Sequence, residues 1–168
     1  MTPEQFVEKF YPYAIEVQNE TSIPAVAILA QAALESGWGE KAIKNNLFGI
    51  KYRKGDKGFI KVLTTEYTDS PNDFKGLDIV EVKFDVEKKK YRYKLHCYFA
   101  NYDSPKEGFM AHAKLLLSER YKPAMRYVHS PKRFLIAVWR CGYATDPNYG
   151  RKMCDMVDSV NRRLRHSF

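Results

Sequence analysis

The sequence predicts an α+β protein with a mainly helical lobe, a small β-hairpin lobe and a cleft between them. Two observations lead to this prediction. Helix-start signals recur in both halves of the chain, and the residues between them change to strand-forming types. At 168 residues the chain has the usual size of one domain. We therefore expect a single domain over residues 1–168, with the β lobe at about 58–102.

Four helix starts share one signature, in which Ser, Thr or Asp is followed by Pro. The first residue can cap free amides, and proline suits the first helical turn. The four pairs are Thr2-Pro3, Ser104-Pro105, Ser130-Pro131 and Asp146-Pro147. Glu107 extends the signature at Ser104 to a capping box. A fifth helix should begin near Pro24 and end at Gly37. The five predicted helices cover about 3–18, 24–36, 105–118, 131–141 and 147–164.

The predicted β lobe interleaves Val, Ile, Thr, Tyr and Phe with charged residues, as in FIKVLTTEY and YRYKLHCYF. This pattern is typical of strands. The stretch TDSPNDFKG between them is rich in turn residues. We expect EKKKYRYK to form a basic edge of the sheet, where lysines resist pairing with other strands.

The composition favours a polyanionic partner, because 28 Lys and Arg stand against 20 Asp and Glu, a net charge of +8. Nucleic acid, an anionic membrane face and an anionic wall polymer all fit this charge. No apolar run is long enough to span a bilayer, and the N-terminus shows no signal peptide. If the target lies outside the membrane, the signal is absent from this chain or export takes another route.

Cysteine and histidine give no sign of a metal or disulfide framework. The three cysteines cannot all pair, and none lies in a CxxC motif. The four histidines lack ligand spacing, so we expect neither a metal nor another cofactor. His96 and Cys97 are adjacent on a predicted strand and point to opposite faces, so they cannot act together as base and nucleophile.

Glu35 is the strongest candidate for chemistry. It lies near the end of a helix of mostly apolar residues and shares a face with Ile28, Gln31 and Ala32. Desolvation and the negative end of the helix dipole both disfavour its ionised form, so its pKa should be raised. A general acid for glycoside cleavage needs such a carboxyl. On these grounds alone, a glutamate that reaches solvent at a frayed helix end is an equal alternative.

Three motifs follow one another along the chain: ALESGWG at 33–39, NNLFGIK at 45–51 and GYATDPNYGRK at 142–152. Together they resemble the glucosaminidase domain of glycoside hydrolase family 73, which occurs in bacterial autolysins, flagellar muramidase-type proteins and phage lysins. LAQA before the glutamate and FANYDSPKEGFMAHAKLL, with His112, add to the resemblance. It covers nearly the whole chain in the right order.

The resemblance implies a lysozyme-like fold and an endo-β-N-acetylglucosaminidase that hydrolyses the β-1,4 bond between N-acetylglucosamine and N-acetylmuramic acid in peptidoglycan. It implies that Glu35 is the general acid. It also suggests Glu66, in TTEY, as the second carboxylate, which positions water or stabilises the oxocarbenium-like transition state. Asp69, Asp73 and Asp78 are alternatives for that second role.

Five residues are candidates for substrate binding, each with a structural alternative. Trp38 offers a flat face beside the acid or belongs to the core, and Asn46 binds a sugar amide or caps a turn. Phe48 follows in the same motif. The resemblance places Tyr143 near the acid and Tyr149 facing sugar. Asp146, directly before a proline, fits helix capping better than a catalytic base.

Two other functions remain as alternatives. A lytic transglycosylase would form an anhydro sugar from the same polymer, and a basic nucleic-acid-binding module would use clusters such as Lys88-Lys89-Lys90. The second explains none of the motifs, so we expect no nucleic-acid partner. We expect a monomer that acts on the cell wall, outside the cytoplasm or delivered by phage, and whose basic surface meets anionic wall polymers.

Overall fold

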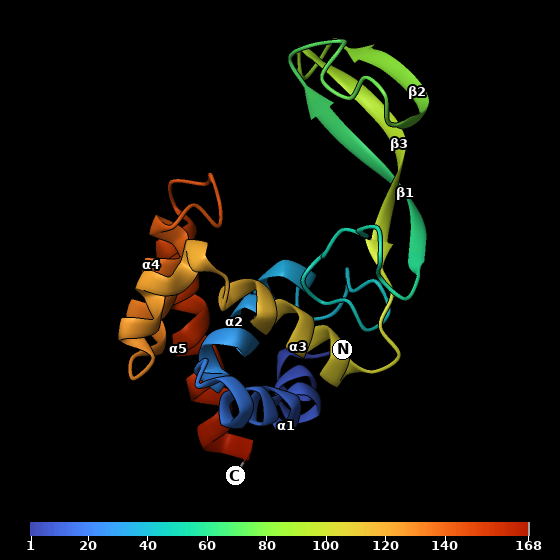
Figure 1. Ribbon diagram of the computed structural model, residues 1–168. Helices are drawn as coiled ribbons and strands as arrows, with labels where there is room; N and C mark the ends of the chain where they lie inside the picture. The colour runs from blue at the N-terminus through green and yellow to red at the C-terminus, as the bar shows by residue number, and fades with distance from the viewer. Residues whose placement is uncertain (168) are drawn as a thin grey trace. The chain divides into compact units, whose positions relative to one another are not determined.

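Figure 1 shows the protein as a computed structural model, which describes residues 1–167. The chain divides into a helical unit, formed by Met1–Ile50 and the residues from Tyr102 onward, and a β unit, Lys51–Asn101. The α+β class predicted from the sequence is confirmed, with the strands confined to one segment of the chain. The structure adds a third strand to the predicted hairpin.

The helical unit contains the five predicted helices and one segment that was not predicted. That segment is a 3-10 helix, η1 (Glu119–Tyr127), with Pro123 inside it. Its short polar sequence lacks the periodicity that identifies a longer helix. The five others are α1 (Pro3–Thr21), α2 (Ala25–Ser36), α3 (Pro105–Leu116), α4 (Pro131–Arg140) and α5 (Tyr149–Ser167).

Helix α2 forms the centre of the helical unit and packs against α1, α4 and α5. Nine of its 12 residues are buried, because nearly every position of AVAILAQAALES is apolar or small. Its N-terminus follows a proline and has no side-chain cap of its own. Instead, Gln18 of α1 accepts a hydrogen bond from the amide of Ala25 at 2.8 Å. One helix thus satisfies the exposed donor of the next.

The helix starts agree with the Ser/Thr/Asp-Pro signature, although the caps differ in detail. Ser104 accepts from the amide of Glu107 at 3.3 Å, as a capping box requires. The Glu107 carboxylate binds the amide of Asp103, one residue before the expected partner. Asp146 accepts from the amide of Asn148 at 2.8 Å, just before α5 begins. The capping interpretation of Asp146 therefore holds in the structure.

The β unit is a three-stranded antiparallel sheet in the order β1-β3-β2, drawn as a long twisted ribbon in Figure 1. Its strands are β1 (Phe59–Thr68), β2 (Asp78–Asp85) and β3 (Lys90–Ala100). The prediction that EKKKYRYK forms a sheet edge is wrong. Lys88 and Lys89 lie in the turn before β3, and the rest of the stretch from Lys90 belongs to β3, which is the central strand. DIVEVKF supplies the edge strand β2, so both sides of β3 are paired.

One face of the sheet carries the apolar side chains of β3. Tyr93 and Leu95 are both buried on this face. The ring of Phe74, from the turn-rich stretch TDSPNDFKG, lies 5.0 Å from the Tyr93 ring at a steep angle. This stretch therefore folds over the sheet and gives the β unit a small core of its own.

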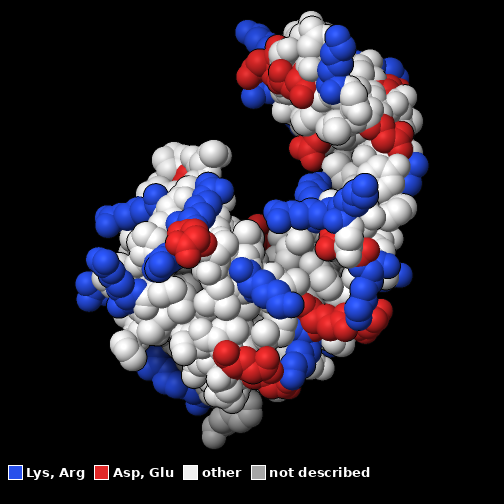
Figure 2. All heavy atoms as spheres, in the orientation of Figure 1, with Lys and Arg blue, Asp and Glu red and all other residues white. Residues whose placement is uncertain are grey.

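None of the helices within residues 1–167 is long and apolar enough to cross a membrane. Figure 2 shows that Lys and Arg on the visible face are scattered among acidic and neutral residues in both units. Lys and Arg side chains of the protein also form ion pairs with acidic residues, such as Lys106 with Glu16 and Lys132 with Asp158. The net charge of +8 is therefore spread over the surface and forms no single stripe on this face.

Gly108 should be essential for packing of α3. A Cβ at this position would collide with the backbone carbonyl oxygen of Asn45, which belongs to the loop after α2. The substitution Gly108→Ala should therefore lower the free energy of unfolding by about 1–3 kcal/mol, because the backbone must move. Gly58→Ala is the matched control, since nothing lies within 4 Å of its added Cβ. Urea denaturation measures both, and equal stability of the two variants would contradict this packing.

Candidate active site

The C-terminus of α2 is closed by the residues that follow Glu35. Gly37 adopts the left-handed conformation, with φ of 56°, and its amide binds the carbonyl oxygens of Ala33 and Leu34. The hydroxyl of buried Ser36 donates to the carbonyl of Ala32 at 2.6 Å and accepts from the amide of residue 39 at 2.9 Å. The last turn, which carries Glu35, is therefore held by local hydrogen bonds and is not frayed.

Glu35 forms one hydrogen bond to a distant part of the chain. The hydroxyl of Tyr149, at the first position of α5, donates to Glu35 Oε1 at 3.0 Å. Part of the Glu35 side chain is exposed to solvent, whereas Tyr149 is buried. Burial raises the pKa of the Glu35 carboxyl, and the Tyr149 hydrogen bond opposes this in part. The raised pKa expected from the sequence is therefore present, with desolvation as its main cause.

The Tyr149 hydroxyl is joined to two further polar residues inside the helical unit. Gln31, one turn before Glu35, donates from Nε2 to the Tyr149 oxygen at 3.4 Å. Its Oε1 atom lies 3.0 Å from Nε2 of His112 on α3. Both Gln31 and His112 are completely buried. A chain of hydrogen bonds therefore runs from α3 through α2 and α5 to the exposed carboxyl.

Aromatic rings surround this chain. The Tyr143 ring lies 5.6 Å from that of Tyr149 and 5.9 Å from that of His112, edge to face with the latter. Tyr121 of η1 lies 6.1 Å from Tyr143. Burial, and next the nearby Glu35 carboxylate, raise the pKa of the Tyr143 phenol. Burial also raises the pKa of the Tyr149 phenol, so Tyr143 and Tyr149 stay protonated and can donate hydrogen bonds at neutral pH.

The segment before Tyr143 is positioned by Arg120 from η1. Its guanidinium donates to the carbonyl of Cys141 at 2.9 Å and to that of Gly142. Gly142 has a φ of 88°, and a side chain at this position would meet the guanidinium at 2.6 Å. The turn therefore needs glycine both for its backbone conformation and for the approach of the arginine.

The structure adds a contact to the acid that was not expected within the GYATDPNYGRK motif. Tyr143 was expected near the acid and Tyr149 facing sugar. Tyr149 is the residue bonded to Glu35, because α5 begins at this position and packs against α2. Tyr143 is the more exposed of the two. Gly150, the next residue, allows α5 to approach Trp139 of α4, since a Cβ there would meet the indole ring at 2.8 Å.

The other predicted binding residues pack within the helical unit. Trp38 contacts the edge of Phe6, and the guanidinium of Arg163 lies 5.0 Å from its ring. Phe48 is 7% exposed and stacks on His112 with a centroid distance of 4.0 Å. Asn46, 1% exposed, binds both the amide and the carbonyl of residue 50 through its side chain. Phe48 and Asn46 therefore offer little surface to a ligand. Phe48 packs against His112, and Asn46 holds the loop that leads to residue 50.

Glu66 lies in the other unit, on β1, where it is exposed and opposite Tyr93 in the sheet register. Within residues 1–167 it forms no hydrogen bond or ion pair through its carboxylate. The three alternatives all have partners in the β unit. Asp69 pairs with Lys90 and Asp73 accepts from Thr68. Asp78 binds Lys61, His96 and Tyr98, which lower the pKa of its carboxyl to about 2.

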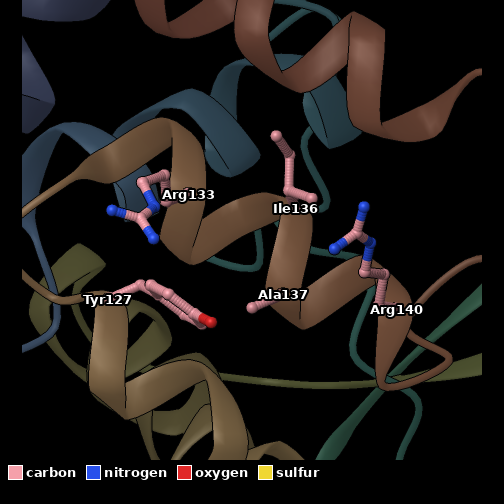
Figure 3. A pocket seen from close by; sticks show the side chains of 5 residues that line it. All are labelled: Tyr127, Arg133, Ile136, Ala137 and Arg140. Carbon is pink, nitrogen blue, oxygen red and sulfur yellow. The ribbon is translucent and has the colours of Figure 1, made fainter.

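A separate hollow of about 250 Å³ lies on the helical unit between η1 and α4 (Figure 3). The lining residues are Tyr127, Arg133, Ile136, Ala137 and Arg140. The lining contains two cations and no carboxylate, so the hollow offers no acid for catalysis.

Within residues 1–167, no three His, Cys, Asp or Glu side chains come together as a set of metal ligands.

Gln31 and Tyr121 are site residues that the sequence analysis did not assign. Gln31 was noted only as sharing the face of Glu35, and the available signal was a polar residue on an otherwise apolar helix face. Tyr121 lies in the unpredicted η1, so nothing in the sequence connected it to the other tyrosines. His112, which the sequence analysis named only as part of the family resemblance, is fully buried.

Comparison with known proteins gives consistent results. The profile of the glucosaminidase family, described as mannosyl-glycoprotein endo-β-N-acetylglucosaminidase, matches residues 11–162. The peptidoglycan hydrolase FlgJ of Vibrio cholerae is 34% identical over 169 residues, which cover 93% of this chain and 44% of the relative. The exo-glucosaminidase LytG of Bacillus subtilis is 32% identical over 83% of this chain and 44% of the relative. The chain thus spans less than half the length of these relatives.

Solved structures give the same picture. The glycoside hydrolase domain of FlgJ from Salmonella typhimurium superposes with a TM-score of 0.73 at 27% identity, covering 99% of this chain and 93% of that one. The catalytic domain of the autolysin Auto from Listeria monocytogenes has a TM-score of 0.71 at 26% identity, with 98% and 88% covered. With its α+β fold and the motifs around Glu35, this chain belongs to the glucosaminidase family of glycoside hydrolases, family 73.

Proposed function

We propose that this chain is an endo-β-N-acetylglucosaminidase that hydrolyses the β-1,4 bond between N-acetylglucosamine and N-acetylmuramic acid in peptidoglycan. The observation that carries the proposal is the Glu35 carboxyl, whose pKa is raised by burial and which is bound by the Tyr149 hydroxyl. Membership of the family and the peptidoglycan hydrolases among the relatives support the substrate. The site of action is then the cell wall.

Glu35 serves in this proposal as the general acid. A leaving sugar oxygen needs a proton as the glycosidic bond breaks, and a carboxyl with a raised pKa holds one near neutral pH. Oε1 is occupied by the Tyr149 hydroxyl, so Oε2 is the oxygen that can face the substrate. The partly exposed position of Glu35 at the end of α2 lets a glycan reach it. Tyr143, beside it, supplies a phenol that can bind a sugar oxygen.

Glu66 is the second carboxylate in this proposal. It positions water or stabilises positive charge at the anomeric carbon. The proposal favours Glu66 over the three nearby aspartates because their carboxylates are engaged by other residues of the β unit. Its own carboxylate is exposed and therefore available to a ligand.

Replacement of the acid should abolish hydrolysis without unfolding the protein. Glu35→Gln keeps the shape of the side chain and a group that can accept from Tyr149, but it cannot deliver a proton. Digestion of purified peptidoglycan should slow by about a hundredfold or more. Mass spectrometry of the products, with circular dichroism to check the fold, measures this. Full activity of the variant would rule out Glu35 as the acid.

The products of the wild-type digest also test the bond and the mode of cleavage. A new reducing N-acetylglucosamine end on fragments of mixed length supports the endo-glucosaminidase. Release of small units only, from chain ends, would indicate exo cleavage instead. A 1,6-anhydro end would indicate a lytic transglycosylase.

Removal of the Tyr149 hydroxyl should change the pH dependence. This hydroxyl favours the ionised form of Glu35, so Tyr149→Phe should raise the Glu35 pKa further. A general acid loses activity as pH rises through its pKa. The alkaline limb of the kcat/KM profile should therefore move to higher pH, by about one unit. A limb that stays in place or moves to lower pH would show that this hydrogen bond does not act on the acid.

The role of Glu66 can be tested against a matched carboxylate in the same unit. Glu66→Gln should lower kcat by about tenfold or more, because one charge at the reacting sugar is lost. Glu87→Gln, on the exposed turn between β2 and β3, makes the same chemical change and should leave kcat within about twofold. Kinetics on soluble glycan fragments give both values. Similar kcat values for the two variants would exclude Glu66 from catalysis.

A further inference from the structure

The buried residues behind Glu35 form a hydrogen-bond chain with one direction. An amide oxygen can only accept, so the contact between Gln31 Oε1 and His112 Nε2 requires a proton on Nε2. The other ring nitrogen, Nδ1, is buried and has no hydrogen-bond partner within residues 1–167. Burial lowers the His112 pKa to about 3, so the ring is neutral. His112 therefore has a single tautomer, with its proton directed at Gln31.

The same contact with His112 holds the Gln31 amide in one orientation. Because Oε1 is bound to His112, the NH2 group must face the Tyr149 oxygen, 3.4 Å away. The Tyr149 oxygen then accepts from Gln31, and its own proton is left for Glu35 Oε1, 3.0 Å away. Each donor along the chain points toward the carboxyl.

The direction of the chain affects the acid in both of its protonation states. When Glu35 is ionised, the Tyr149 hydrogen bond stabilises the carboxylate. When Glu35 is protonated, Oε1 still accepts from Tyr149, so the proton must be on Oε2. No residue within 1–167 hydrogen-bonds to Oε2. The proton is therefore on the oxygen that faces away from Tyr149.

We propose that His112 and Gln31 are positioning residues that force Tyr149 to donate to Glu35 and so keep the acid proton on Oε2, where a substrate can receive it. This inference rests on the proposed role of Glu35 as general acid. The reverse chain would be inactive. If the Gln31 amide turned over, Oε1 of Gln31 would accept from Tyr149, and Glu35 could donate its proton uselessly to the Tyr149 oxygen.

Of the groups around this hydrogen-bond chain, Glu35 is the one whose titration the hydrogen bonds control. The titratable residues joined to Glu35 through hydrogen bonds or ring contacts are Tyr149 of α5, His112 of α3, Tyr143 of the loop before α5 and Tyr121 of η1. His112 is neutral, and burial raises the pKa of Tyr143 and Tyr149. Within residues 1–167 no Lys or Arg forms an ion pair with Glu35. A change of pH dependence in variants of the chain therefore reports on hydrogen bonds.

Two single variants and their combination test the proposal. His112→Phe keeps a ring to stack on Phe48 but frees the Gln31 amide to turn over. This should raise the Glu35 pKa by about half a unit or more and lower kcat by about tenfold. Gln31→Met fills the space but cannot bind Tyr149, so the Tyr149 proton stays on Glu35 and the pKa should rise by only a few tenths of a unit.

The double variant gives the decisive comparison. Gln31→Met should partly reverse the effect of His112→Phe, because no amide remains to take the Tyr149 proton. A simple loss of packing predicts the opposite, since two disruptions of one core should add or worsen. If the double variant has a lower kcat and a higher Glu35 pKa than His112→Phe alone, the proposal is overturned.

Readouts that need no catalysis separate this proposal from the role of Glu35. Carbon-13 NMR of the side-chain carboxyls, with Glu35→Gln to assign the resonance, gives the Glu35 pKa in each variant. Nitrogen-15 NMR of the wild-type ring should show neutral His112 with its proton on Nε2 between pH 5 and 8. A proton on Nδ1 or a charged ring would overturn the proposal even if the variants did not fold. If only the digestion tests fail, the chain of hydrogen bonds stands and the catalytic role of Glu35 falls.

Discussion

The hydrogen bond between Tyr149 and Glu35 joins residues 114 positions apart and requires the end of α2 to meet the start of α5. Several features of the helical unit make this meeting possible. The small residues of α2 let other helices pack closely around it. Gly37 ends α2 two residues after the acid, and Gly150 lets α5 approach α4. The carboxyl is thus held by the packing of whole helices and not by a flexible loop.

Buried polar side chains lower the stability of the helical unit unless they form hydrogen bonds, and those behind Glu35 form them with one another. Gln31 and His112 are fully buried, and each has a hydrogen bond to the next residue toward Glu35. The chain ends at one unsatisfied atom, Nδ1 of His112. A buried acceptor without a partner costs free energy. Such a cost is typical of functional sites, where the direction of the hydrogen bonds and the protonation state of the reacting group matter more than stability.

The sequence was a good guide where local chemistry decides the structure. Helix starts at Ser104 and Asp146 follow from capping by the side chain itself, and Gly37 ends α2 as expected. It failed where distant contacts decide. Nothing local distinguishes β3 as the central strand, because that position depends on which segments pair with it. η1 was missed for the same reason, since tertiary packing rather than periodicity holds it.

The candidate site was predicted in the same uneven way. The raised pKa of Glu35 followed from its apolar helix face, which is a property of neighbouring residues in the sequence. The hydrogen bond from Tyr149 to Glu35 was not predicted, because the turn before α5 determines which hydroxyl reaches the acid. Phe48 and Asn46 looked available for a ligand in a turn-like motif, and their burial depends on α3 and on the fold of the loop. Side-chain direction at such positions is not encoded in the local pattern.

The central claim is that burial raises the Glu35 pKa by more than the Tyr149 hydrogen bond lowers it, so the carboxyl stays protonated to a higher pH than in the unfolded chain. Its most direct test is the pH dependence of unfolding free energy for the wild type and Glu35→Gln. A carboxyl with a raised native pKa binds more protons in the folded state, so it favours folding at low pH, and this contribution is lost as pH rises through the native pKa. Glutamine does not titrate, so the variant should gain stability relative to the wild type as pH rises from about 4 to 8. A difference that stays constant, or that moves in favour of the wild type, would contradict the account.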